Sequence, residues 1–269
     1  MATNRIGFKK FVKDVSINER INIIIDSNLL ISYFDEVHSD HDDTVAFLKN
    51  LDDKGKVTFY TTVTTKSEFL DYHRKRFLTE GLVGLVRELS DKINISTIAK
   101  SKIQNALTLR DNRLRKEEKK YQEIEEFNSS INYFTDNDIK EIKKAFRARD
   151  VQEERGWLSI CSVFLGMKLS KCESLLDEFC TYLTTRDEKQ RELFVVDEVD
   201  WKKSTEISSE TGMSYSDSMI LNMALSTNIK NIATLDFDII YAGAISALSK
   251  TILLPDRRIK TFKNILKKV

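Results

Sequence analysis

Five acidic residues of this chain could together bind a divalent cation. They are Asp26, Glu68, Asp217, Asp236 and Asp238. Carboxylates that lie close together repel one another, and without a positive charge between them some take up protons. Mg²⁺ and Mn²⁺ prefer oxygen ligands, and a bound ion can polarise a phosphoryl oxygen and lower the pKa of a water molecule. If the side chains converge, the chemistry that they predict is attack of water on a phosphate ester.

The segments around these acids indicate how a fold could bring them together. Asp26 directly follows the apolar, β-branched segment INIII, which is typical of a central parallel strand, and Asp236 follows the strand-like segment KNIAT after one residue. In open α/β sheets, ligands bind beyond the carboxyl ends of the strands. Glu68 and Asp217 lie near the starts of two predicted helices, which we expect to leave that same edge of the sheet.

Each acid also has a purely structural interpretation. Asp26 suits the N-cap of the helix that follows it. Thr65 and Glu68 have the spacing of a capping box, and Ser214 and Asp217 nearly repeat it. For any single acid the capping interpretation is favoured, whereas the complete set, placed at strand ends, favours a metal site. The sequence contains no G-x-G-x-x-G, P-loop or G-x-S-x-G motif that would indicate a rival site.

The order of the predicted elements indicates an α/β sheet built from the two ends of the chain. The predicted strands are residues 21–25, 57–62, 193–196, 230–234 and 251–255. The helix that carries Glu68 is expected to be long and to be interrupted near Gly81 or Gly84. Residues 93–192 are rich in charge and have apolar residues at helical spacing, which predicts an all-helical insertion.

The composition restricts the class of protein. Of the 269 residues, 41% are hydrophobic and 32% are charged, which suits a helix-rich globular protein. The net charge is only +1, so contact with a nucleic acid would need a local basic surface. No window approaches the roughly 18 apolar residues of a membrane span. The three cysteines lack C-x-x-C spacing, which favours free thiols. We therefore expect a cytoplasmic protein without a membrane partner.

Four segments, in this order, resemble the motifs of the PIN-domain nucleases, the family that includes the VapC-type toxins. The segments are IIIDSNLLI with Asp26, Ser27 and Asn28; TTKSEFL with Glu68; TGMSYSDSMILNMAL with Gly212, Ser214 and Asp217; and IATLDFDI with Thr234, Asp236 and Asp238. The resemblance covers residues 20–92 and 193–255. It implies a discontinuous nuclease domain with a PIN-like parallel sheet flanked by helices, an all-helical insertion at 93–192 and a basic tail at 256–269.

The resemblance further implies a metal-dependent nuclease that most often acts on RNA, in which water attacks the phosphodiester and leaves a 5′-phosphate and a 3′-hydroxyl. Mg²⁺ or Mn²⁺ would be the cofactor. Asp26, Asp217 and Asp236 would be catalytic metal ligands, Glu68 would be a ligand or orient the water, and Asp238 would support a second ion. Hydrogen bonds from Ser27, Asn28 and Thr234 would hold the carboxylates in place.

The substrate and partners are open at this stage. Arg74, Lys75 and Arg76 could contact an RNA backbone, or they could form a solvated helix face. The family includes toxins, so a defence effector and a protein inhibitor of the antitoxin kind are both compatible with the sequence. The apolar helices of the insertion leave room for a homodimer. DNA as substrate, and a non-catalytic PIN-like module that binds RNA or protein, are the alternatives.

Overall fold

The structure of the protein is a computed structural model that describes residues 5–16, 20–89, 92–121, 132–245 and 250–259. The chain forms two compact units. The first, here called the sheet unit, contains residues Met1–Phe69 and Leu176–Val269. The second, here called the helical unit, contains residues Leu70–Leu175.

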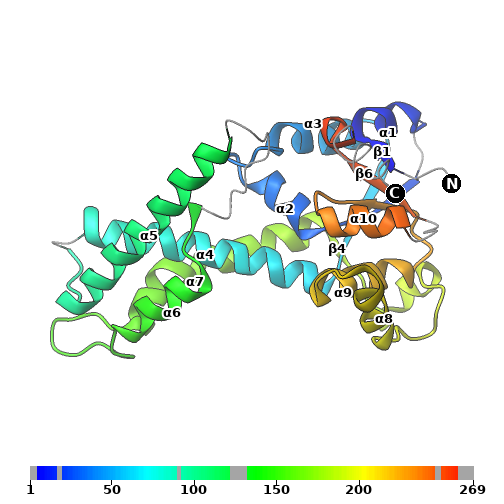
Figure 1. Ribbon diagram of the computed structural model, residues 1–269. Coiled ribbons are helices and arrows are strands. Elements are labelled where there is room, and N and C mark those ends of the chain that lie inside the picture. The colour runs from blue at the N-terminus through cyan, green and yellow to red at the C-terminus, as the bar shows by residue number, and fades with distance from the viewer. Residues whose placement is uncertain (1–4, 17–19, 90–91, 122–131, 246–249, 260–269) are drawn as a thin grey trace. The chain divides into compact units, whose positions relative to one another are not determined.

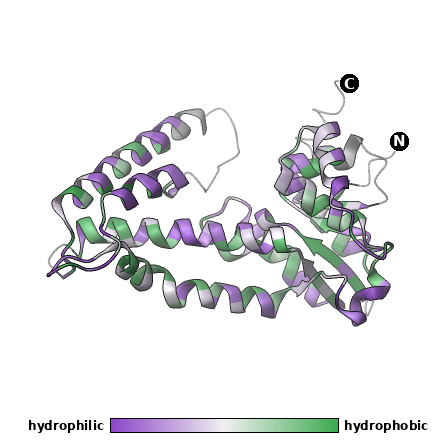
Figure 2. Cartoon of the chain, turned by 90° about the horizontal axis from the view of Figure 1, so that it is seen from below, coloured by the Kyte–Doolittle hydropathy of each residue, from purple (hydrophilic) through white to green (hydrophobic). Residues whose placement is uncertain are grey.

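The sheet unit is an α/β fold, as the sequence predicts. Its strands are β1 (Arg5–Gly7), β2 (Arg20–Ile25), β3 (Lys56–Thr61), β4 (Thr181–Tyr182), β5 (Asn231–Ala233) and β6 (Thr251–Leu254). They form one six-stranded sheet in the order β1-β6-β5-β2-β3-β4, and all neighbouring pairs are parallel. Figure 2 shows that these strands are mainly hydrophobic, which is expected where helices cover both faces of a parallel sheet.

The order in which the chain adds strands to the sheet reverses at the middle of the sheet. From β2 the chain adds β3 and β4 on one side, and β5 and β6 lie on the other side. The neighbours β2 and β5 therefore flank a topological switch point, which is the usual place of a ligand site in such sheets. Ile23, Ile24 and Ile25 of β2 are fully buried, so this strand is covered on both faces.

Helices pack on the sheet in two groups. The helices of the sheet unit are α1 (Phe8–Asp14), α2 (Ser27–Phe34), α3 (His41–Asp52), α8 (Lys202–Thr211), α9 (Tyr215–Leu225) and α10 (Phe237–Ile245). Helix α3 contacts α1 and α2, with Phe8 stacked on Phe47 at a ring-centroid distance of 3.9 Å. Helix α9 contacts α8 and α10 (Figure 1). Ile24, Ile220 and Ile240 share the core beneath this second group.

The helical unit is formed by α5 (Thr97–Tyr121), α6 (Asp136–Lys144) and the adjoining parts of α4 (Val63–Arg87) and α7 (Trp157–Phe179). Its own core includes Leu82, Ile103, Ile142 and Trp157. Helix α6 begins at a capping box, in which Thr135 accepts a hydrogen bond from the Asp138 backbone and the Asp138 carboxylate accepts one from the Thr135 backbone. The unit therefore has both local helix signals and a separate hydrophobic core.

Helix α4 is continuous, so the predicted interruption near Gly81 or Gly84 is wrong. The reason is that Gly81 lets α4 and α7 pack closely against one another. A Cβ atom added at Gly81 would lie 2.2 Å from the Phe164 ring of α7, so only glycine permits this close approach. At Gly84 the nearest atom to such a Cβ, on Leu89, is 3.8 Å away.

The predicted strand at residues 193–196 is also wrong. Residues Glu188–Leu193 form a 3₁₀ helix, and Phe194 makes only an isolated bridge with Thr227. Val195 and Val196 are 62% and 41% exposed. The apolar run LFVV has strand propensity, but its side chains do not enter a sheet, and tertiary context overrides the propensity.

The unit boundaries differ from the predicted domain boundaries. The helical unit includes residues 70–92, which the resemblance places in the nuclease domain, while residues 176–192 of the predicted insertion belong to the sheet unit and contain β4. Helices α4 and α7 run continuously through the boundaries, so no loop or change of composition marks them in the sequence.

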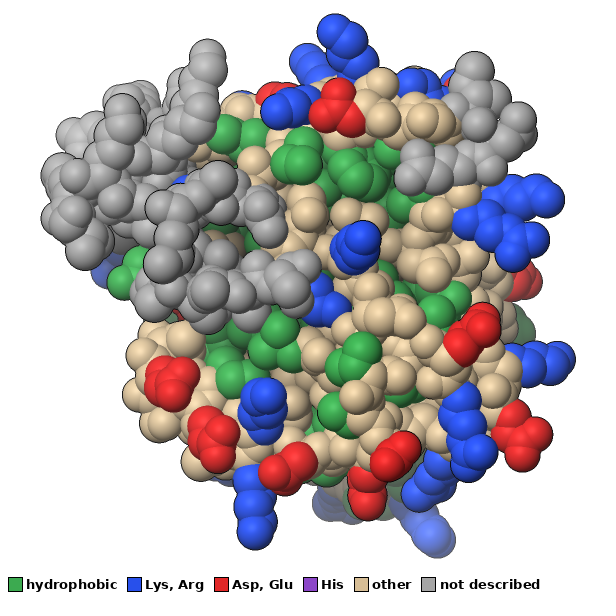
Figure 3. All heavy atoms as spheres, turned by 90° about the vertical axis from the view of Figure 1, so that its right-hand side faces the viewer, with side chains coloured by type: hydrophobic (Ala, Val, Ile, Leu, Met, Phe, Trp, Pro, Cys, Tyr) green, Lys and Arg blue, Asp and Glu red, His purple; other side chains and the backbone are tan. Residues whose placement is uncertain are grey.

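No helix in the described part of the chain is long and apolar enough to cross a membrane. On the face of the molecule shown in Figure 3, the described Lys and Arg side chains are interspersed with Asp and Glu.

Candidate metal centre

Asp26 lies at the carboxyl end of β2 and is buried, with 1% of its surface exposed. One carboxylate oxygen accepts a hydrogen bond from the Ser27 backbone at 2.7 Å, which makes Asp26 the N-cap of α2. The other oxygen accepts the Thr234 hydroxyl at 2.8 Å. The Asp26 backbone donates to the carbonyl of Ala233, so the carboxyl ends of β2 and β5 are joined directly beside the switch point.

Asp236 lies just beyond the end of β5 and begins α10. Its Oδ1 atom accepts hydrogen bonds from the backbones of Asp238 and Ile239, at 2.7 Å and 3.2 Å. Its Oδ2 atom accepts the side-chain amide of Asn28 at 3.2 Å, and its backbone donates to the Thr234 hydroxyl. Thr234 therefore links Asp26 and Asp236, and both carboxylates are held by polar groups on neighbouring elements.

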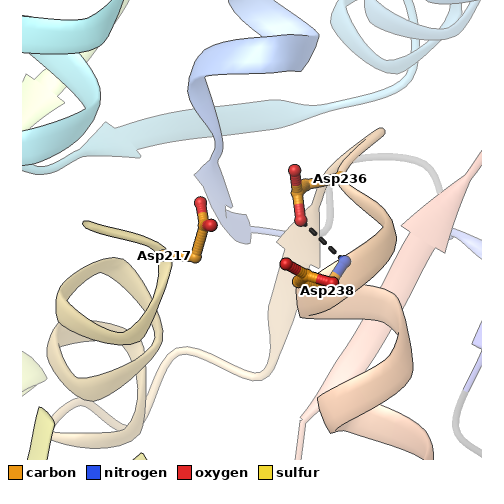
Figure 4. Close-up of side chains that lie close together, drawn as sticks. All are labelled: Asp217, Asp236 and Asp238. Carbon is orange, nitrogen blue, oxygen red and sulfur yellow. Dashed lines mark hydrogen bonds between the residues drawn. The ribbon is translucent and has the colours of Figure 1, made fainter. Parts of the chain in front are cut away.

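Asp217, Asp236 and Asp238 form the densest acidic group in the described structure. Each offers one carboxylate oxygen, and these oxygens all lie within 4.8 Å of one another. Asp217 comes from the first turn of α9, where Ser214 caps the helix, and the other two come from the start of α10 (Figure 4). Asp238 lies in the first turn of α10, and within the described residues no hydrogen bond reaches its carboxylate.

Glu68, on α4 within the sheet unit, joins the group through hydroxyl groups. Its Oε2 atom accepts the Ser27 hydroxyl at 2.6 Å, and its Oε1 atom accepts the hydroxyl of Ser216 on α9. The Ser27 hydroxyl also lies 3.3 Å from an oxygen of Asp26. Three helix beginnings, those of α2, α4 and α9, are thus tied together around one carboxylate.

The electrostatics of the site show that these acids act on one another. Burial, followed by the charge of Asp236, raises the pKa of Asp26 to about 8, against the opposing hydrogen bond from Thr234. Burial, together with the charges of Asp236, Glu68 and Asp238, raises the pKa of Asp217 to about 6. The pKa of Asp236 is raised too, chiefly by burial, although the backbone hydrogen bonds to its carboxylate lower it.

These properties fit a divalent cation. At neutral pH the site alone cannot hold all its carboxylates ionised without cost, and a cation between them offsets that cost. The donors are all oxygens, which suits Mg²⁺, Mn²⁺ or Ca²⁺ better than a metal that prefers sulfur or imidazole ligands. The group Asp217, Asp236 and Asp238 could hold the ion, and Asp26 and Glu68 lie beside this group.

The structure thus brings the five acids of the sequence prediction into one region. Ser27, Asn28 and Thr234 each donate a side-chain hydrogen bond to at least one of these carboxylates. Sequence reasoning did not find Ser216. Its only signal is a hydroxyl one residue before Asp217, and its partner Glu68 lies 148 residues away.

The three basic residues that could contact an RNA backbone are paired with acids of the chain. In the helical unit, Arg74 and Lys75 each form ion pairs with Asp71 and Asp136, and Arg76 pairs with Glu80.

Two arginines of the predicted basic tail bind within the sheet unit. Arg257 and Arg258 both reach the buried carboxylate of Asp40, and Arg258 also donates to the carbonyl of Leu235, the residue before Asp236. They therefore serve to hold the fold. The remaining tail, residues 260–269, lies outside the described residues.

Comparison of the chain with protein-family models, curated proteins and solved structures gives no match. The geometry of the acidic site and the sequence motifs around it are therefore the evidence for a function.

Proposed function

We propose that this chain is a metal-dependent nuclease of the PIN-domain type, which hydrolyses phosphodiester bonds of RNA with Mg²⁺ or Mn²⁺. The observation that carries the proposal is the meeting of Asp217, Asp236 and Asp238, whose carboxylate oxygens lie within 4.8 Å of one another. The position of the site at the switch point between β2 and β5 supports it, because ligands bind there in open α/β sheets.

The side chains divide into two roles. Asp217, Asp236 and Asp238 hold the ion, which when bound supplies polarisation of a phosphoryl oxygen and activation of the attacking water. Glu68 orients that water. Ser27 and Ser216 fix the direction of its carboxylate, yet a carboxylate has about four acceptor sites, so sites for a water remain.

Asp26 has a supporting role in this proposal. It is buried, its oxygens accept hydrogen bonds from Ser27 and Thr234, and it is not among the three acids whose oxygens lie within 4.8 Å of one another. The Thr234 hydroxyl donates to Asp26 and accepts from the backbone of Asp236, so Asp26 fixes the start of the loop that carries Asp236.

RNA is proposed as the substrate because of the family that the motifs resemble. Metal-assisted attack on the phosphate does not depend on the sugar, and discrimination between RNA and DNA needs contacts to the 2′-hydroxyl. The test therefore includes both.

The experiment incubates purified protein with labelled RNA and with DNA of the same sequence, in Mg²⁺, in Mn²⁺ and in EDTA. We expect wild type to cleave RNA only with metal, leaving a 5′-phosphate. Asp217→Asn should reduce cleavage by more than about 100-fold, because it removes a member of the ion-binding group. Asp52→Asn, which alters an exposed aspartate of α3, is the matched control and should cleave like wild type.

Two results would contradict the proposal. One is equal cleavage by wild type and Asp217→Asn, which would trace the activity to a contaminant or to another site. The other is binding of RNA without cleavage in either metal, which would favour a non-catalytic binding module.

A further inference from the structure

The helical unit contains an excess of positive charge in one short segment. Residues 70–175 include 21 Lys and Arg and 17 Asp and Glu. Residues 140–149 alone contain five basic residues and one acid, which accounts for the whole excess. By contrast, the cations that the sequence suggested for RNA contact, Arg74–Arg76, are neutralised by acids within 2.9 Å.

Four of the cations in residues 140–149, Lys140, Lys143, Lys144 and Arg147, together with Lys102 of α5, are here called the α6 patch. Helix α6 buries Ile139 and Ile142 against the core of the unit, so its lysines face solvent. Lys144, Lys102 and Lys140 all lower the pKa of Glu141, so Lys102 of α5 lies near the lysines of α6. All five side chains are exposed.

Structural needs explain only part of the α6 patch. Lys143 and Lys144 lie in the last turn of α6, where cations interact favourably with the helix dipole. Lys102 lies within α5, and Arg147 lies beyond the end of α6, so the dipole explains neither. In the described structure Lys144 pairs with Glu141, whereas Lys102, Lys140, Lys143 and Arg147 have no acid within ion-pair distance.

We propose that the α6 patch binds the phosphodiester backbone of a nucleic acid, an inference that rests on the proposed nuclease function. Lys and Arg bind phosphates through charge and hydrogen bonds, with release of condensed counterions. The α6 patch contains no aromatic side chain on which a base could stack, so it holds the backbone without reading sequence. In this proposal the helical unit contributes affinity for the nucleic-acid backbone that does not depend on the metal.

The experiment measures binding without cleavage. Asp217→Asn protein in EDTA is titrated against a fluorescent 20-nucleotide RNA, a DNA of the same sequence and polyglutamate, at several salt concentrations. The patch variant carries Lys140→Gln, Lys143→Gln and Arg147→Gln. The matched control carries Lys189→Gln, Lys202→Gln and Lys203→Gln, three exposed lysines of the sheet unit with the same change of net charge.

We expect the patch variant to bind RNA about 10- to 100-fold more weakly than the control variant near 0.1 M salt. The slope of log K against log salt should fall by about 2, since each lost phosphate contact removes about 0.7 on a single strand. Binding of DNA should weaken in parallel, because the backbone is shared.

Equal binding by the patch and control variants would overturn the proposal, and so would tighter binding of polyglutamate than of either oligonucleotide. Because the assay needs neither metal nor cleavage, a failure of the α6 patch and a failure of the nuclease proposal give different results. Melting curves of both variants show whether each is folded.

Discussion

At the level of single residues, the acids of this site serve as helix caps and as potential ion ligands at once. Asp236 uses one oxygen to cap α10, and Asp217 belongs to the first turn that Ser214 caps. Each carboxylate nevertheless contributes an oxygen to the cluster. The two interpretations of the sequence, cap and ligand, are therefore compatible. Asp238 also lies in the first turn of a helix, where an acid is favourable, but within the described residues its carboxylate accepts no hydrogen bond.

Ser216 provides a test of how Glu68 is positioned. Ser216→Ala removes the hydroxyl that α9 donates to Glu68, so the carboxylate is held from one side only. We expect cleavage to fall about 10- to 100-fold, as is typical when a group that orients a site residue is lost. Ser216→Thr, which keeps the hydroxyl, should restore most of the activity in the same single-turnover assay.

The control for this prediction is Ser209→Ala on α8, where the lost hydroxyl contacts only the Glu206 carbonyl. A Ser216→Ala protein as active as this control would show that Ser27 alone positions Glu68.

The sequence predicts which acids form the site, but it predicts only some of the contacts between their side chains and the rest of the chain. Asp26 directly follows INIII and Asp236 follows KNIAT after one residue, so their place at the carboxyl edge of the sheet could be predicted. Ser216 could not be predicted, because its role depends on a distant side chain brought near by α4 and α9.

At the level of elements, the four inner strands of the sheet were predictable from sequence and the two edge strands, β1 and β4, were not. β2 and β3 have runs of six residues with apolar, β-branched character. β1 and β4 contain three and two residues, lack a run of apolar, β-branched residues, and are strands only because β6 and β3 offer them partners. The strand-like run at 193–196 fails for the converse reason, since it has no sheet neighbour.

Gly81 and Gly84 of α4 are a matched pair of positions at which the packing of the helical unit can be tested. Gly81→Ala places a methyl group against Phe164 near the base of its ring, so we expect a loss of about 2 kcal/mol of unfolding free energy. Gly84→Ala meets no close atom and should stabilise α4 by up to about 1 kcal/mol through helix propensity. Urea denaturation of both variants measures the difference. A stabilising Gly81→Ala would mean that α4 and α7 do not approach so closely.

At the level of the whole molecule, the acidic site makes stability depend on pH and metal. The folded pKa values of about 8 for Asp26 and about 6 for Asp217 lie above the ordinary value of 3.8. Between roughly pH 4 and pH 8 the folded protein therefore holds protons that the unfolded chain has released. The free energy of unfolding of the metal-free protein should consequently fall as pH rises through this window.

Asp26→Asn isolates the contribution of the most buried acid. In EDTA its unfolding free energy should fall less steeply than that of wild type between about pH 6 and pH 8, because the group that titrates there is gone. Chemical denaturation at several pH values measures both slopes. Identical slopes for wild type and Asp26→Asn would show that Asp26 does not retain a proton in the folded protein.

The most direct measurement is a calorimetric titration of Mn²⁺ into wild type, Asp238→Asn and the control Asp52→Asn. If the acidic cluster is a metal site, wild type and the control bind equally. Asp238→Asn should bind at least about tenfold more weakly, with an unfolding temperature in EDTA that is unchanged or higher, because its carboxylate makes no structural hydrogen bond within the described residues. Absence of binding by wild type, or undiminished binding by Asp238→Asn, would contradict the metal site and the nuclease proposal with it.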